Sequence, residues 1–158
     1  MILIVDSGST KSDWIAIDTN GKQLLEKLRT KGLNPEILKE GKLKKLIKKN
    51  PDLKANRHGV THVFFYGAGC GTERGKELVY NVLKEVFVNA VVKVEEDTMA
   101  AVYGTINHDS EAAVVCILGT GSNCSYFDGT QLHQRVQSLG YILMDDAAGN
   151  YYGKELIR

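Results

Sequence analysis

The sequence has few cysteines, no long hydrophobic run and almost no net charge, and each of these absences excludes a class of protein. The three cysteines, Cys70, Cys116 and Cys124, are odd in number and form no Cys-x-x-Cys pair, which argues against a disulfide framework or a zinc site. No apolar run approaches the ~20 residues that a membrane-spanning helix needs. A formal net charge of +1 argues against a general nucleic-acid-binding protein.

The composition is that of a soluble globular protein. Hydrophobic residues make up 43% and charged residues 25% of the 158 residues, a size that suits one or two domains. The first apolar run has no basic region before it and is too short for a signal peptide, so we expect a cytoplasmic location. Cys116 lies within an apolar run and is predicted to be buried as a small hydrophobic side chain.

The start of the chain combines a short apolar segment with a polar turn. The apolar segment ends in Asp6 and is followed by Gly8, Ser9, Thr10 and Lys11. A strand that ends here would present a carboxylate, backbone amides, hydroxyls and an ammonium group together, and these groups suit a magnesium-bound nucleotide phosphate. The alternative is an ordinary hairpin turn, in which serine and glycine are common.

Hydrophobic periodicity predicts alternating strands and helices. Strands are expected at residues 2–5, 14–18, 24–29, 62–66 and 91–94, and helices at 36–49, at 73–87 with Thr72 as its cap, and at 98–106. A strand at 112–118, two strands around the turn at Asp128 and a helical tail at 147–158 follow. The order βββαβαβα, then βββ, predicts an α/β fold with a mixed sheet in a first domain at 1–110 and an incomplete, similar domain at 111–158.

The second predicted domain repeats the pattern of the chain's first residues. The apolar segment that ends in Leu118 is followed by Gly119, Thr120, Gly121 and Asn123, and then by a returning strand. Two strand–turn–strand units of this kind indicate a duplicated fold whose halves face each other across a cleft. A run of acidic residues that ends in Asp97 lies between the two turns in sequence.

These two turns and the intervening Glu95–Asp97 resemble the actin/hexokinase/Hsp70 superfamily, and more narrowly its BadF/BadG/BcrA/BcrD-type ATPases and N-acetylglucosamine kinases. The resemblance extends along essentially the whole chain but covers only the N-terminal part of that two-domain family. It implies a ribonuclease H-like, actin-type ATPase domain and ATP-dependent phosphoryl transfer to an amino sugar such as N-acetylglucosamine, with ATP and Mg²⁺ required. The alternatives are an ATPase activator subunit of a reductase or dehydratase, and an inert sugar- or nucleotide-binding module.

The resemblance also implies roles for individual residues. Asp6 would organise Mg²⁺, and Asp97 would be the catalytic base that accepts a sugar hydroxyl proton, although a helix cap is the alternative for Asp97. The expected phosphate-binding residues are Gly8, Ser9, Thr10, Lys11, Gly119, Thr120 and Gly121. The expected sugar-binding residues are Asn34, Thr120, Asn123, Gly140, Tyr141 and Asp145.

The segment that follows Asp145 departs from the family pattern. Asp146 is one methylene shorter than the usual glutamate, and Ala147 and Ala148 replace a glycine and a serine. If that glycine needs a positive φ, Ala147 is strained. The short second domain is expected to leave apolar surface uncovered, which predicts a fragment or a homodimer that self-associates through this domain, with weak ATP affinity. The expected ligands are an amino sugar and ATP, without nucleic acid or membrane.

Overall fold

The computed structural model describes residues 1–106, 111–119, 121–134 and 145–158. Internal contacts divide the chain into two compact units, Met1–Asp97 and Thr98–Arg158. The sequence suggested a domain boundary between residues 110 and 111. In the contact-based division the second unit begins earlier, at Thr98, and therefore includes nearly all of the helix that starts at Asp97. No helix in the described ranges is long and apolar enough to cross a membrane.

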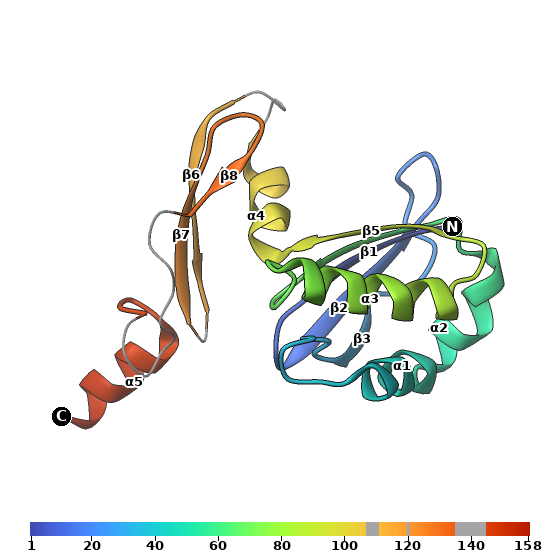
Figure 1. Cartoon of the computed structure of the whole chain (residues 1–158), viewed down its shortest axis with the longest axis horizontal. Coiled ribbons are helices and arrows are strands. Elements are labelled where there is room, and N and C mark those ends of the chain that lie inside the picture. The colour runs from blue at the N-terminus through green and yellow to red at the C-terminus, as the bar shows by residue number, and fades with distance from the viewer. Residues whose placement is uncertain (107–110, 120, 135–144) are drawn as a thin grey trace. The chain divides into compact units, whose positions relative to one another are not determined.

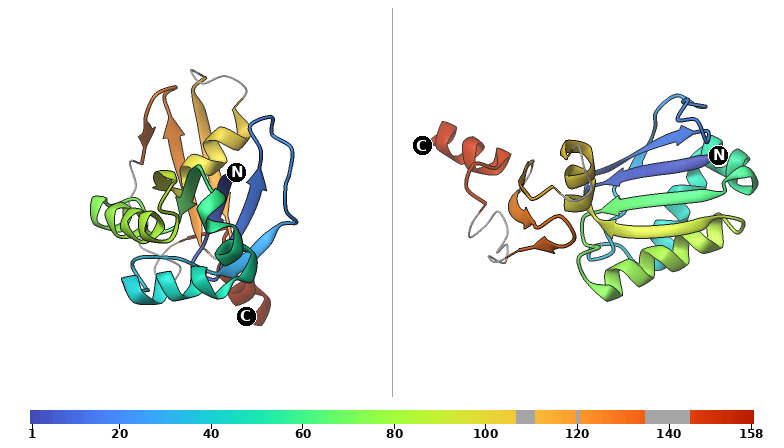
Figure 2. Two further views of the ribbon diagram at one scale, coloured as in Figure 1. Left: turned by 90° about the vertical axis from the view of Figure 1, so that its right-hand side faces the viewer. Right: turned by 90° about the horizontal axis from the view of Figure 1, so that it is seen from above.

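The first unit is built on a mixed five-stranded sheet in the order β3-β2-β1-β4-β5. Strand β1 pairs antiparallel with β2, and β2 with β3, whereas β1, β4 and β5 run parallel (Figure 2). The parallel strands therefore end together at one edge of the sheet. The strands span β1 Ile2–Ser7, β2 Lys11–Ile17, β3 Leu28–Lys31, β4 His62–Gly67 and β5 Val91–Glu96.

Two long helices, α1 and α3, pack on one face of this sheet (Figure 1). The Thr72 hydroxyl accepts a hydrogen bond from the Gly75 amide at the start of α3, which confirms the predicted cap. The helix predicted at 36–49 begins later, and a second short helix that the sequence did not reveal follows it, capped by Asn50. The helical segments are α1 Glu40–Lys49, α2 Pro51–Asn56, the 3₁₀ turn η1 Arg57–Gly59 and α3 Glu73–Val86.

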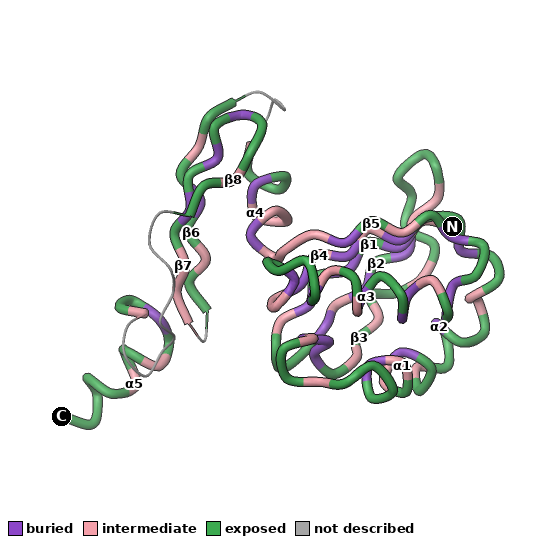
Figure 3. Tube along the Cα trace, viewed as in Figure 1, coloured by how far each residue is buried: buried purple, intermediate pink, exposed green. Residues whose placement is uncertain are grey.

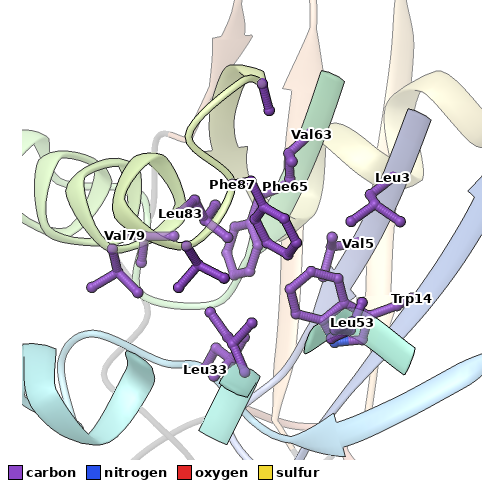
Figure 4. Close-up of a cluster of buried hydrophobic side chains, with 14 of the residues drawn as sticks. Leu3, Val5, Trp14, Leu33, Leu53, Val63, Phe65, Val79, Leu83 and Phe87 are labelled. Carbon is purple, nitrogen blue, oxygen red and sulfur yellow. The ribbon is translucent and has the colours of Figure 1, made fainter. Parts of the chain in front are cut away.

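The hydrophobic core lies between the sheet and these helices (Figure 4). Alternation along β1 buries Leu3 and Val5 on this face, where Trp14 and Phe65 from the neighbouring strands are also fully buried. Figure 3 shows buried stretches along the strands of this sheet. Each such side chain contributes roughly 1.5–3 kcal/mol when fully buried. The core therefore fixes β1 in the centre of the sheet, and with it the turn that follows Ser7.

The second unit is smaller. Its sheet has the order β6-β7-β8 with antiparallel pairing, and Val102 of α4 packs against Val115 and Phe127 in a small cluster. This agrees with the predicted group of three strands followed by a helical tail. Its elements are α4 Asp97–Thr105, β6 Ala113–Leu118, β7 Ser122–Phe127, β8 Leu132–His133 and α5 Gly149–Ile157.

The prediction that Cys116 is buried is wrong. Val115 points into the small cluster, so the next residue, Cys116, points to the opposite face of β6, where it is exposed. An apolar run predicts burial on both faces of a strand, but in the described residues of this unit only one face of β6 packs against the cluster.

Asp13 forms an ion-paired cluster between β2 and β3. Its carboxylate accepts hydrogen bonds from Arg29 Nε at 2.6 Å and Nη2 at 3.3 Å, and Lys27 Nζ lies 3.0 Å away. The pKa of Asp13 is lowered from 3.8 to about 2, chiefly by the hydrogen bond from Arg29. Burial opposes this shift, and Lys27 adds to it. The charged form of Asp13 is thus preferred in the folded state.

We predict that Asp13→Asn lowers the free energy of unfolding at pH 7 by about 1 kcal/mol. Because the folded-state pKa is depressed, this contribution is present above pH 3.8 and is lost as the pH falls towards 2. Urea unfolding at pH 7 and at low pH should therefore separate the two proteins only at pH 7. Glu26→Gln, which removes an equal charge from an exposed side chain, is the control and should leave stability unchanged.

Candidate functional site

The turn between β1 and β2 presents its polar groups to solvent. The Gly8 amide donates to the Lys11 carbonyl at 2.9 Å, which closes the turn, and Ser9, Thr10 and Lys11 are exposed. Ser7 is buried instead, and its hydroxyl lies 2.7 Å from that of Ser12. The turn therefore combines a fixed, buried base with exposed hydroxyl and ammonium groups, which can donate hydrogen bonds to an anion.

The segment after β3 holds this turn from outside. The Leu33 amide donates to Ser7 Oγ at 3.0 Å, and the Gly32 amide donates to the Thr10 carbonyl at 2.9 Å. A Cβ atom on Gly32 would lie 2.4 Å from the Gly8 carbonyl oxygen and from Ser9 backbone atoms, so only glycine fits there. The conformation of the turn thus depends on a residue distant in sequence.

Asn34 is tied to the same turn. Its side chain is 8% exposed; Nδ2 donates to Ser9 Oγ at 2.9 Å, and Oδ1 accepts from the Glu36 amide at 2.9 Å. The family resemblance predicted a sugar contact for Asn34. In the structure its amide holds Ser9 in position, a role that the sequence did not reveal. Any sugar contact by Asn34 would use the remaining hydrogen-bonding capacity of the amide.

The loop after β4 packs against Asn34. The Ala68 amide donates to the Ser7 carbonyl at 2.8 Å, which places this loop beside the end of β1. Gly69 has φ +82°, and a Cβ atom there would lie 2.2 Å from Asn34 Oδ1. Gly69 thus allows the close approach of the loop to Asn34. The sequence contains a signal for this loop, because Gly67 and Gly69 directly follow a predicted strand. The sequence assigned no function to these two glycines.

Asp6 and Asp13 lie side by side on neighbouring strands but differ in their partners. Asp13 is paired with three cations, Lys11, Lys27 and Arg29, whereas Asp6 forms no ion pair within the described ranges. An exposed carboxylate that no cation neutralises suits a hard divalent ion. Because Mg²⁺ is commonly held by one or two carboxylates together with substrate phosphates, Asp6 fits this role without a preformed metal cage.

Asp97 is the first residue of helix α4 and directly follows β5. Because β5 and β1 run parallel within one sheet, Asp97 and the turn at Gly8 lie at the same edge. A helix N-terminus carries a partial positive charge, which stabilises the ionised form of a carboxylate there. Asp97 therefore lies at the same edge of the sheet as the turn at Gly8.

Glu96 and Cys70 surround Asp97 at this edge. Burial and the neighbouring charge of Asp97 raise the pKa of Glu96. Burial and the same charge raise the pKa of Cys70 to about 12, so Cys70 remains a thiol at neutral pH and is no nucleophile. The sequence singled out Asp97 in this acidic run but missed the half-buried Glu96, whose Oε2 would lie 3.1 Å from a Cβ atom on Gly71.

The second turn joins β6 to β7. The Gly119 amide donates to the Gly121 carbonyl at 2.9 Å, and the Gly149 amide donates to the Gly119 carbonyl at 2.8 Å. Ser122 Oγ donates to the Asp146 carbonyl at 2.9 Å, and a Cβ atom on Gly121 would lie 2.5 Å from Asp145 Oδ2. The structure thus brings the segment before α5 onto the second predicted phosphate turn.

The remaining predicted sugar contacts are only partly described. Asn123 lies on β7, and its Oδ1 accepts hydrogen bonds from Ser125 Oγ at 3.3 Å and Gln134 Nε2 at 3.1 Å. Thr120, Gly140 and Tyr141 lie outside the described residues. Of the sugar-contact residues expected in the second unit, Asp145 therefore lies against the turn and Asn123 lies on the strand that leaves it.

The expected strain at Ala147 is present. Ala147 has φ +64° and Asp145 has φ +71°, which is the left-handed region where glycine is favoured. Alanine at position 147 therefore has a conformational cost. The hydrogen bond from Ala148 N to the Asp145 carbonyl at 3.1 Å helps to hold this turn.

The mixed sheet and the paired strand–turn–strand units define a protein of the actin-like ATPase fold. The chain is 34% identical to a proposed N-acetylglucosamine kinase from Porphyromonas gingivalis, with a TM-score of 0.85 over 99% of this chain and 55% of that one. MreB5 of Spiroplasma citri, solved bound to ADP, is 16% identical with a TM-score of 0.61, over 98% of this chain and 54% of that one.

The chain belongs to the actin/hexokinase/Hsp70 superfamily, as the sequence predicted. It spans about half the length of the structures that it matches. No protein-family model matches the chain, and no curated protein does.

We predict that Gly32→Ala destabilises the first unit by at least about 2 kcal/mol, because the new methyl group meets backbone atoms of the turn. Chemical unfolding monitored by Trp14 fluorescence would measure the loss. Gly41→Ala, in helix α1 with no atom within 4 Å of its Cβ position, is the matched control. The control should be neutral or stabilising by up to about 1 kcal/mol, and equal losses in both variants would contradict the proposed contact.

Ala147→Gly should raise the free energy of unfolding of the second unit by about 1 kcal/mol, since glycine adopts positive φ without steric cost. Hydrogen exchange of the α5 amides is a suitable measurement, because it reports on this unit alone. Ala148→Gly, at a neighbouring residue with φ −77°, is the control and should be destabilising. A loss of stability in Ala147→Gly would contradict the strain.

Proposed function

We propose that the chain is the N-terminal part of an ATP-dependent kinase that transfers a phosphoryl group to an amino sugar such as N-acetylglucosamine. The observation that carries this proposal is the common position of the Gly8–Lys11 turn and Asp97 at one edge of the first sheet. The similarity to a proposed N-acetylglucosamine kinase supports the sugar as the acceptor.

The first turn is proposed to bind the phosphates of ATP. The phosphate oxygens would accept hydrogen bonds from the amide and hydroxyl groups of Ser9 and Thr10. The exposed ammonium of Lys11 would neutralise part of their negative charge. Asp6 would hold Mg²⁺, which supplies charge neutralisation at the β- and γ-phosphates when it is bound. Asn34 and Gly32 keep the turn in place, so the donors need little rearrangement when the nucleotide arrives.

Asp97 is proposed as the general base. Its carboxylate accepts the proton of a sugar hydroxyl while the hydroxyl oxygen forms a bond to the γ-phosphorus, and the bond to the β,γ-bridging oxygen breaks to release ADP. Glu96 next to it, with a raised pKa, gains a proton more readily than an ordinary glutamate.

Residues of the second unit have proposed binding roles of their own. Gly119, Thr120 and Gly121 would bind phosphate oxygens, and Asn123, Gly140, Tyr141 and Asp145, together with Asn34 and Thr120, would contact the sugar. Polar groups of this kind favour the matching sugar, because an analogue that lacks a hydroxyl leaves them unpaired. These assignments follow from the family resemblance of the turn.

An inert sugar- or nucleotide-binding module is the second candidate function. The observation in its favour is the strained backbone at Ala147 and Asp145, beside the second turn. A turn beside a strained segment can still bind a ligand, but it would position the reacting groups less accurately for phosphoryl transfer. Calorimetry that detects sugar and Mg²⁺-ADP binding without turnover would support this candidate over the kinase.

We predict that Asp97→Asn lowers kcat for phosphoryl transfer to N-acetylglucosamine by about 10²–10⁴-fold, because the amide cannot accept the proton. Radiolabelled ATP and separation of the sugar phosphate would measure the rate, and Mg²⁺-ADP affinity should remain within a few-fold. Glu95→Gln is the matched control. It makes the same change of charge two residues from Asp97, at a side chain that is paired with Lys76 at 3.2 Å and has no proposed catalytic role. Unchanged kcat in Asp97→Asn would remove Asp97 from the mechanism, and a chain that binds neither ligand would remove the proposed function.

A further inference from the structure

Two thiols face each other on the second sheet. Cys116 of β6 and Cys124 of β7 are direct partners in the antiparallel register, and their sulfur atoms lie 2.9 Å apart. Both side chains are exposed. Among the described residues, Cys70 is the remaining cysteine, and it is fully buried in the first unit. The chain thus has one accessible pair of thiols and one inaccessible thiol.

The backbone around the pair suits an intramolecular disulfide. Directly opposite residues of antiparallel strands have Cβ atoms about 4.5–5.5 Å apart, and a disulfide needs about 3.5–4.5 Å. The two sulfurs are already in contact across the register, so closing the bond requires only a small approach of the strands. The strands are also joined by the short turn at Gly119, which limits how far they can separate.

We propose that Cys116 and Cys124 form a redox-active dithiol site that reacts with a small-molecule disulfide such as oxidised glutathione. One thiol loses its proton and attacks a sulfur of the small disulfide, whose S–S bond breaks and releases one thiolate. The second cysteine then loses its proton, attacks the protein-bound sulfur and releases the other thiolate. The protein loses two electrons and two protons, and the small disulfide gains both to become two thiols.

The site lies on the strands that carry the second turn. Cys116 and Cys124 are two register positions from Leu118 and Ser122, the pair that borders Gly119–Gly121. A covalent link at this place restricts the separation and twist of the two strands. The oxidised and reduced forms are therefore expected to differ in the freedom of the turn, a consequence that does not depend on what the turn binds.

The experiment treats the folded chain with oxidised glutathione, alkylates the remaining thiols under denaturing conditions and determines the intact mass and the cross-linked peptides. We expect two alkylation sites to be lost, an intramolecular Cys116–Cys124 link and an unreacted Cys70. Cys70→Ser, the control, should behave as the unmodified chain does. Cys116→Ser should stop at a stable glutathione adduct on Cys124, and Cys124→Ser at one on Cys116, which identifies the second thiol as the one that resolves the adduct.

Three outcomes would overturn the proposal. The first is stable glutathione adducts on both Cys116 and Cys124 of the unmodified chain, which would mean that the thiols do not resolve each other. The second is a disulfide between two copies of the chain, which non-reducing electrophoresis detects. The third is no reaction of either thiol. Repeating the reaction in urea should lower the yield of the internal link several-fold, because unfolding removes the register that holds the thiols together.

Discussion

The conformation of the first turn depends on a close backbone contact made by a segment distant in sequence. Gly32 lies against Gly8 and Ser9 with no room for a side chain, and Leu33 donates to the buried hydroxyl of Ser7. Because these contacts restrict the turn from outside, its amide and hydroxyl donors are fixed before a ligand arrives. Preorganised donors lose less free energy on binding than donors that must first be ordered.

Parallel pairing explains why the groups of the first unit can act together. Strands β1, β4 and β5 end at one edge, so the turn at Gly8, the loop at Gly69 and the helix that begins at Asp97 lie there. Each comes from a different part of the sequence. The core that packs against one face of these strands keeps their relative register, and this register in turn keeps the spacing of the polar groups.

Local chemistry in the sequence predicted the order of the elements and the Thr72 cap, because periodicity and capping depend on residues close along the chain. The family resemblance, rather than local chemistry, predicted the strain at Ala147, because the family pattern has a glycine there. The sequence could not predict that Asn34 holds Ser9, or that Cys116 is exposed opposite Cys124, because these depend on contacts and on strand faces set by the whole fold.

The two turns differ in how their conformations are maintained. The first is held by buried hydrogen bonds to Ser7 and by a glycine that fits its neighbours. The segment that lies against the second turn has Asp145 and Ala147 at positive φ. Positive φ at a residue other than glycine costs roughly 1–2 kcal/mol. A ligand bound at the second turn as proposed would have to be held by a segment whose conformation already costs free energy. The first turn has no such cost among its described residues, because buried hydrogen bonds and a close backbone fit hold its conformation.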